Sequence, residues 1–214
     1  MCYYVYMGNS AIIFEKLNSL IECPKSELEY SNNFELLVAV MLSAQCTDKR
    51  VNMITKDLFK KYATPLDFAK LSVEELAAEI KSCNYYHNKA CHIVEASKML
   101  VEKFGGVVPS SHEDLVSLPG VGNKTARVVR VVAFGEQVMP VDTHILRVSN
   151  RLGLVSTNSP DVCSCELSKI FKNYDLGVVH HLLLLFGRYY CTARTPKCNG
   201  CILRDICKDI NKKV

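Results

Sequence analysis

The sequence lacks the features that mark membrane, secreted and β-rich proteins. No apolar stretch approaches the length of a membrane span, and no basic start is followed by a long apolar run and a small-residue cleavage site. No run alternates between apolar and polar residues with period two, and internal repeats are absent. We therefore expect an all-α protein of the cytoplasm with no membrane partner.

The chain also lacks a strong net charge. Its formal charge of +4 is compatible with an anionic partner but does not require one. With 214 residues, of which 49% are apolar, the chain can bury a full core as one domain or as two small lobes. Basic residues gather in the second half, although such a group by itself is equally compatible with a solvated surface. Its members are Lys124, Arg127, Arg130, Arg147, Arg151, Arg188, Arg194 and Lys197.

Cysteine, by contrast, is abundant. Eleven cysteines in a chain that we expect to be intracellular indicate reduced thiols or metal ligation, not a disulfide framework. Seven are scattered without ligand spacing, whereas four follow the pattern C-x6-C-x2-C-x5-C and can converge on one metal centre. The spacing leaves a structural zinc site and an iron-sulfur cluster both open. The four are Cys191, Cys198, Cys201 and Cys207.

Helical periodicity and capping residues predict about ten helices. Four of these helices are expected to begin after the capping residues Thr47, Ser111, Asp142 and Ser159. Apolar spacing and stop signals predict helices over residues 11–20, 34–43, 72–82, 87–104 and 177–190.

The stretch from Leu115 to Asp142 organises the chain. Pro119 fixes its own φ, and Gly120 and Gly122 can adopt positive φ, so residues 118–122 predict a tight turn. Outward-pointing backbone N–H groups in such a turn can hold a phosphate. A short helix precedes the turn and a second one follows it, so the unit is helix, hairpin, helix.

Two chemically useful side chains follow this hairpin. Lys124 lies in the first turn of the second helix, where unpaired N–H groups carry partial positive charge and disfavour a second cation. A neutral amine there is a nucleophile. Asp142 is placed to cap the next helix. Taken singly, Lys124 can be only a phosphate-contacting cation and Asp142 only a cap.

Together, the strings LPGVGNKTA and VDTHILRVSNRLGL resemble the helix-hairpin-helix DNA glycosylases, most closely the endonuclease III family, over almost the whole chain. The resemblance implies two helical lobes with DNA crossing the cleft between them. One lobe, residues 26–136, would hold six helices and the hairpin. The other would join residues 1–25 to 137–214 and carry the cysteine loop. We expect a monomer that binds damaged double-stranded DNA.

The same resemblance implies the chemistry. The protein would be a base-excision-repair DNA N-glycosylase and abasic-site lyase that removes oxidised pyrimidines from duplex DNA. Lys124 would attack C1′ of the sugar and form a Schiff base, from which β-elimination cuts the strand, while Asp142 stabilises developing positive charge. The pattern of the four closing cysteines resembles the family's 4Fe-4S site, which favours that cofactor over zinc.

Further residues are assigned to DNA by the resemblance. Gln45, in the string LSAQCTD, would fill the gap left by an extruded base, and Asp48 would line the lesion pocket. Tyr85 aligns with an apolar wedge, the alternative being a tyrosine packed on its own lobe. The remaining expected DNA contacts are Gly120, Val121, Gly122, Thr143, His144, Arg194 and Lys197.

Two residues depart from the family pattern, because Asn84 replaces an expected glycine and Asn123 an expected arginine. Two other functions stay open. A glycosylase without lyase activity, such as the related mismatch adenine glycosylases, shares hairpin, aspartate and cluster but lacks the lysine at position 124. A non-catalytic module would grip DNA through the hairpin and the cysteine loop without any reaction.

Overall fold

The computed structural model describes residues 3–209, and eleven α-helices make up its regular secondary structure. No strand occurs in these residues, which confirms the all-α class. None of the helices in the same range is long and apolar enough to cross a membrane. The chain divides into two compact units, Ser26–Phe134 and the combination of Met1–Lys25 with Gly135–Val214. The role of these units as two lobes around DNA stays a prediction.

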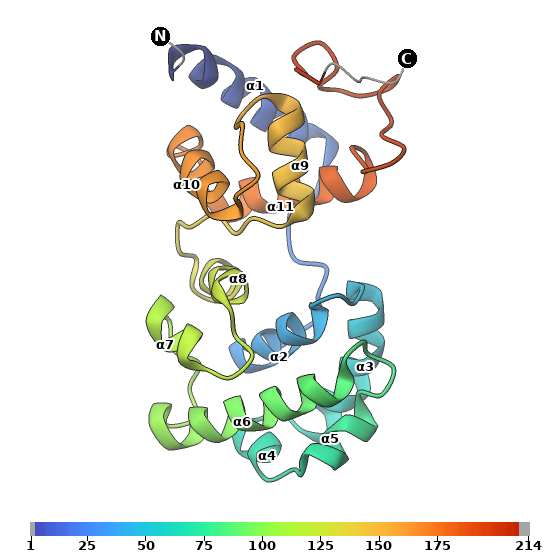
Figure 1. Cartoon of the computed structure of the whole chain (residues 1–214), viewed down its shortest axis with the longest axis vertical. Helices are drawn as coiled ribbons and strands as arrows, with labels where there is room; N and C mark the ends of the chain where they lie inside the picture. The colour runs from blue at the N-terminus through green and yellow to red at the C-terminus, as the bar shows by residue number, and fades with distance from the viewer. Residues whose placement is uncertain (1–2, 210–214) are drawn as a thin grey trace. The chain divides into compact units, whose positions relative to one another are not determined.

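The unit Ser26–Phe134 is built around one buried helix. This helix, α2 (Asn33–Ser43), buries every residue from Phe34 to Leu42, as a helix that is apolar on nearly all sides must. It packs against α3, α6 and α8, while α4 and α5 cover α6 (Figure 1). The other helices of the unit are α3 (Asp48–Lys61), α4 (Pro65–Ala69), α5 (Val73–Glu79), α6 (Tyr86–Phe104), α7 (His112–Ser117) and α8 (Asn123–Phe134).

The second unit has its own core. Its helices are α1 (Tyr3–Leu20), α9 (Thr143–Leu152), α10 (Pro160–Ile170) and α11 (Leu176–Tyr189). The apolar helix α11 packs against α9 and α1, and the buried core of the unit comes from all four helices and the segments that join them. After α11 the chain continues as an irregular loop that contains the four closing cysteines.

Side-chain caps define most helix starts, as the sequence predicts. Besides Thr64 of α4 and Asp175 of α11, six capping residues use a side-chain oxygen to accept the backbone N–H of the residue three positions later, which satisfies one of the helix's orphan donors. Each such cap stabilises its helix by about 1 kcal/mol. The capping residues are Asn32, Thr47, Ser72, Ser111, Asp142 and Ser159.

One helix and two helix boundaries differ from expectation. The short helix α4 was not expected, although Thr64 and Asp67 form a capping box before it and Pro65 occupies its first turn. Helix α5 ends at Glu79 instead of reaching Ser82, because a turn follows in which Cys83 N donates to Ile80 O and both side chains are buried. Helix α1 begins at Tyr3, earlier than the expected start at residue 11.

Candidate active site and cysteine loop

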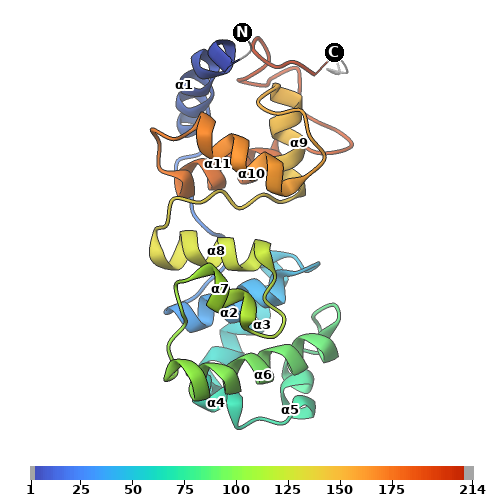
Figure 2. The same cartoon turned by 60° about the vertical axis from the view of Figure 1, so that its left-hand side comes forward.

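The hairpin joins α7 to α8, which lie side by side in the unit Ser26–Phe134 (Figure 2). Gly120 adopts φ +76°, and the N–H groups of Gly120 and Gly122 bond no other group among the described residues. Val121 differs from expectation: its N–H donates to Leu118 O at 3.1 Å, and its side chain is 5% exposed and belongs to the core. The glycine N–H groups, not that of Val121, therefore remain available for a phosphate.

Gly120→Ala should lower the free energy of unfolding by about 1–3 kcal/mol, because its positive φ disfavours any side chain. A Cβ at this position would also lie 2.7 Å from the Cβ of His92 on α6. Gly122→Ala is the matched control, since its φ is not positive and no atom lies within 4 Å of the added Cβ. Urea denaturation of both variants checks the difference, and equal stabilities would contradict it.

Lys124 occupies the second position of α8, directly after the hairpin, and its side chain is exposed. The preceding residue, Asn123, contacts the first helix of the hairpin unit: its Oδ1 lies 3.1 Å from Nε2 of His112 at the start of α7. The contact ties the first turns of the two helices together. The asparagine that departs from the family pattern thus has a local structural role, and the amine beside it faces solvent.

Asp142 is the N-cap of α9, and its Oδ1 accepts the N–H of Ile145 at 2.8 Å. The carboxylate is half-buried. Next to it, Thr143 is exposed, whereas His144 is half-buried, and a Cβ added to Gly187 on α11 would lie 3.0 Å from the Cβ of His144. The Nδ1 of His144 also lies 3.3 Å from Nη2 of Arg147. The DNA contacts expected of Thr143 and His144 stay predictions.

Two loops of the unit Ser26–Phe134 present the residues expected to enter the duplex. Gln45 and Tyr85 both adopt left-handed backbone conformations, at φ 54° and 57°, and both side chains are exposed. Tyr85 is 63% exposed, so the alternative of a tyrosine packed on its own lobe is wrong. Asp48, the first residue of α3, is half-buried. The roles of Gln45, Asp48 and Tyr85 toward DNA stay predictions.

The four closing cysteines line one cavity in the second unit, together with Arg151 and Tyr190. Burial raises the pKa of the Cys201 thiol, and the other three thiols raise it further. Within the described range, however, no three Cys, His, Asp or Glu side chains converge on a point that could hold a single metal ion. Four thiols that line one cavity fit a structural zinc ion or an iron-sulfur cluster in which each thiolate binds its own iron.

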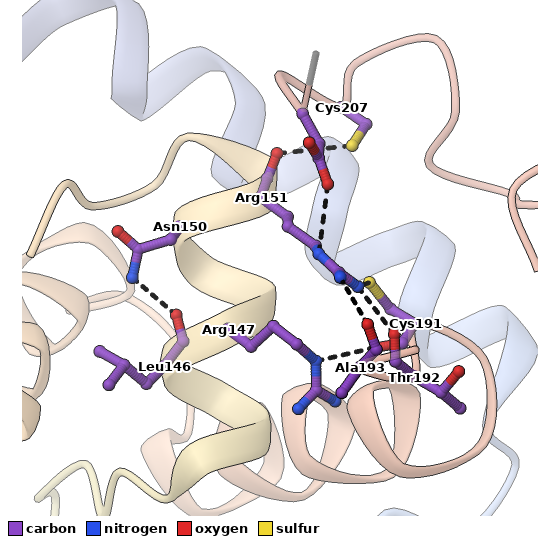
Figure 3. Close-up of polar contacts among 9 residues, drawn as sticks. Leu146, Arg147, Asn150, Arg151, Cys191, Thr192, Ala193 and Cys207 are labelled. Carbon is purple, nitrogen blue, oxygen red and sulfur yellow. Dashed lines mark hydrogen bonds and ion pairs between the residues drawn. The ribbon is translucent and has the colours of Figure 1, made fainter. Parts of the chain in front are cut away.

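Two arginines of α9 hold the cysteine loop (Figure 3). Arg147 donates to Gly187 O at 2.8 Å and to Cys191 O at 3.0 and 3.1 Å. Burial lowers the pKa of Arg147, although Arg is effectively always charged. Arg151 donates to Cys191 Sγ at 3.3 Å and to Thr192 O at 2.8 Å, and it pairs with Asp209. A guanidinium beside a ligand sulfur fits the hydrogen bonding that iron-sulfur clusters receive.

The two basic residues expected to contact phosphates lie within the same loop. Arg194 is exposed, and Lys197 is exposed with its Nζ 5.4 Å from the centre of the Tyr190 ring. Their contacts with DNA stay predictions. The histidines of α11, His180 and His181, are buried, and Nδ1 of His180 lies 3.0 Å from Pro140 O.

Sequence reasoning missed four residues that hold these sites in place. Lys89 Nζ donates to Ala44 O and Asn84 Nδ2 donates to Gln45 O, both beside the loop of Gln45, while Arg147 and Arg151 hold the cysteine loop. One signal was present for Lys89, which occupies the apolar stripe of α6 four residues before Ile93. For the other three, nothing local in the sequence indicates the partner, because the contacts join segments about forty residues apart.

Comparison with known proteins agrees with this geometry. Residues 38–173 match the family model described as HhH-GPD superfamily base excision DNA repair protein. Residues 191–207, the span from the first to the last closing cysteine, match the iron-sulfur binding domain of endonuclease III. The cofactor of this chain is therefore a 4Fe-4S cluster, and the zinc alternative is set aside.

Individual relatives align along nearly the whole chain. Endonuclease III of Bacillus subtilis (strain 168) is 46% identical over 93% of this chain and 91% of its own length. The solved structure of a trapped endonuclease III–DNA covalent intermediate superposes with a TM-score of 0.90 at 42% identity, covering 95% of this chain and 96% of that one. A non-covalent endonuclease III–DNA complex gives a TM-score of 0.91 at 41% identity, with 95% of each chain covered.

The fold, the hairpin with its lysine, the capping aspartate and the cysteine loop agree with these matches, and the chain belongs to the endonuclease III family within the HhH-GPD superfamily of base excision DNA repair proteins.

Proposed function

We propose that this DNA glycosylase and abasic-site lyase acts on oxidised pyrimidines in damaged duplex DNA, with Lys124 as nucleophile and Asp142 as its acidic partner. The observation that carries the proposal is the exposed Lys124 amine in the first turn of α8, directly after a hairpin that can hold a phosphate. The solved structure of a relative as a trapped covalent intermediate with DNA supports a covalent route.

The hairpin would bind the backbone next to the lesion. The N–H groups of Gly120 and Gly122, together with the orphan donors at the N-terminus of α8, provide a sequence-independent site for a phosphate. Binding there would bring the C1′ carbon of the damaged nucleotide to the Lys124 amine. Because C1′ is shielded by stacking inside a duplex, the nucleotide must first be extruded, and damage that weakens stacking lowers that cost.

In the first chemical step, the nitrogen of Lys124 forms a bond to C1′ while the N-glycosidic bond breaks and its electron pair leaves with the base. Asp142 stabilises the positive charge that develops at the sugar and accepts or returns protons. The second oxygen of this carboxylate has that task, because Oδ1 already accepts the N–H of Ile145. The mechanism needs the amine and the carboxylate at one nucleotide.

In the second step, the C1′–O4′ bond of this adduct breaks and O4′ takes up a proton. The resulting iminium at C1′ acts as an electron sink that acidifies the C2′ proton. A base removes this proton, the electrons move toward C1′, and the C3′–O bond breaks, so the strand is cut on the 3′ side of the sugar. Water then hydrolyses the imine and restores the lysine. Neither step changes the oxidation state of the protein.

The 4Fe-4S cluster would be bound by Cys191, Cys198, Cys201 and Cys207, and its iron-thiolate bonds supply the cross-links that close the loop. Arg147 and Arg151 then fix this closed loop on α9, the helix that Asp142 caps. Arg194 and Lys197, both exposed in the loop, would contact phosphates outside the lesion. We also propose that the protein works as a monomer in the cytoplasm.

Three duplexes test the substrate class: one with thymine glycol, one with adenine opposite oxidised guanine, and one with a plain abasic site. We expect base release followed by strand cutting on the first, strand cutting on the third, and no reaction on the second. Reaction with the adenine duplex alone would assign the chain to the monofunctional glycosylases. Binding to all three without any reaction would favour the non-catalytic module.

A further inference from the structure

The ammonium of Lys89 is buried in the unit Ser26–Phe134, away from the residues assigned to chemistry. The side chain belongs to α6 and is 8% exposed. Its Nζ donates to Leu42 O and Ala44 O, both at 2.7 Å, and to Cys83 Sγ at 3.1 Å. An ammonium has three donors, and all three are used here. Burying a charge is costly unless its hydrogen bonds are satisfied, and these three acceptors satisfy the hydrogen bonds of the Lys89 ammonium.

The two carbonyl groups belong to the C-terminal end of α2. The last turn of this helix contains no basic residue of its own, and its final carbonyls carry partial negative charge. Lys89 supplies the missing cation from another helix. The ammonium thereby fixes the point at which the chain leaves α2, one residue before Gln45.

The contact of Lys89 with Cys83 and the side-chain amide of Asn84 fix the loop that contains Tyr85. Cys83, which accepts from Lys89, stands two residues before Tyr85. Between them, Asn84 Nδ2 donates to Gln45 O at 2.7 Å and so joins the two loops directly. A glycine at position 84, as the family pattern has it, would lack this donor.

The residues held in this way are unusual. Among the described residues, Gln45 and Tyr85 are the only ones other than glycine with positive φ. Such conformations are disfavoured for residues with a Cβ and persist only where the surroundings impose them. In these two loops, hydrogen bonds from Lys89 and Asn84 hold the backbone beside Gln45 and Tyr85. The side chains of Gln45 and Tyr85 are both exposed.

We propose that Lys89 and Asn84 are positioning residues that hold Gln45 and Tyr85 as a fixed pair, so that both side chains can enter the duplex when the damaged nucleotide is extruded. The proposal rests on the proposed function, because it assigns the pair to the extrusion step. Fixing the two side chains in advance removes an ordering cost from that step. Lys89 and Asn84 act through the pair and touch neither the sugar nor the base.

The test uses the full-length protein with its cluster and compares Lys89→Met and Asn84→Ala with Lys98→Met. Lys98 is an exposed lysine of the same helix, so its variant loses the same charge without touching the loops. Extrusion is followed by the fluorescence of 2-aminopurine opposite a thymine glycol, and base release is followed under single-turnover conditions. Borohydride trapping on a single-stranded abasic oligonucleotide reports the Lys124 chemistry without extrusion.

We expect Lys89→Met and Asn84→Ala to slow extrusion and base release in the duplex by roughly tenfold or more, because small misplacements of positioning groups have effects of this size. Trapping on the single strand should stay at the wild-type level, and Lys98→Met should match the wild type in every assay. Because Asn84 is exposed, its variant keeps the test valid even if Lys89→Met does not fold.

Two outcomes separate this inference from the proposed function. An active wild type whose Asn84→Ala variant shows unchanged fluorescence and unchanged base release would overturn the inference alone. A uniform loss that includes single-strand trapping would also overturn it, because a general structural role would then explain the data. A wild type that neither releases thymine glycol nor forms an adduct would overturn the proposed function itself.

Discussion

Lys124→Ala should abolish both the borohydride-trapped adduct and strand cutting at abasic sites, a loss of roughly a thousandfold or more. The reason is that no other group in the proposed mechanism can form the imine from which β-elimination proceeds. The variant should fold normally, because Lys124 is exposed in the first turn of α8 and alanine is a good helix former. Its free energy of unfolding should lie within about 0.5 kcal/mol of the wild type.

Gel analysis of trapped and cut products on an abasic duplex measures this effect. Lys103→Ala is a suitable control, since Lys103 is an exposed lysine in the last turn of α6 and has no part in the mechanism. If the Lys124→Ala protein still formed an adduct at the wild-type level, another amine would be the nucleophile. If it released oxidised bases at the wild-type rate, water would be the attacking group and Lys124 only a cation near the phosphates.

Asp142→Asn should reduce base release by roughly a hundredfold to a thousandfold while leaving the protein as stable as the wild type. The carboxylate has two tasks, capping α9 through Oδ1 and balancing charge at the sugar, and asparagine preserves only the first. Asparagine caps helices about as well as aspartate, so the hydrogen bond to Ile145 N survives. Asp142→Ala removes both the cap and the charge, and its free energy of unfolding should be about 1 kcal/mol lower than that of Asp142→Asn.

Single-turnover base release and urea denaturation, measured on the same preparations, separate the two tasks. Ser159→Ala provides the comparison, because it removes the N-cap of α10 in the same unit without removing a charge. That variant should lose about 1 kcal/mol of stability and retain full activity. An Asp142→Asn protein with undiminished base release would mean that Asp142 is only a helix cap.

The features that the sequence predicts well are those that depend on neighbouring residues. A cap such as Thr47 or Ser111 needs only a backbone N–H three residues later, so its signal is local and the structure confirms it. The same holds for the position of Lys124 in the first turn of α8. Helix α4, which was not predicted, has a comparable local signal in Thr64, Pro65 and Asp67.

Features that depend on distant residues could not be predicted in this way. Nothing near Lys89 in the sequence identifies Leu42 O and Ala44 O as its partners, because they lie 47 and 45 residues away. The buried state of Val121 and the exposure of Tyr85 likewise follow from how the helices pack, not from the turn or cap in which each residue stands. The choice between zinc and an iron-sulfur cluster could not be made from the cysteine spacing for the same reason, because spacing along the chain does not fix the distances between the folded thiols.

The cysteine loop shows how the local and distant contributions combine. The spacing of Cys191, Cys198, Cys201 and Cys207 brings four thiols around one cavity. The loop is then held by the arginines of α9 and by Lys16 of α1, whose Nζ donates to Ile202 O at 3.0 Å. The cluster region is therefore part of the packing of its unit, and its loss should loosen α9 as well as the loop.

The most direct test of this account identifies the amino acid that becomes bonded to DNA. The wild-type protein is incubated with an abasic duplex and borohydride, digested, and the peptide that carries the sugar remnant is sequenced by mass spectrometry. Our account predicts one modified side chain, the lysine that follows the hairpin at position 124. A remnant on any other residue, or base release from oxidised DNA with no modified peptide at all, would contradict it.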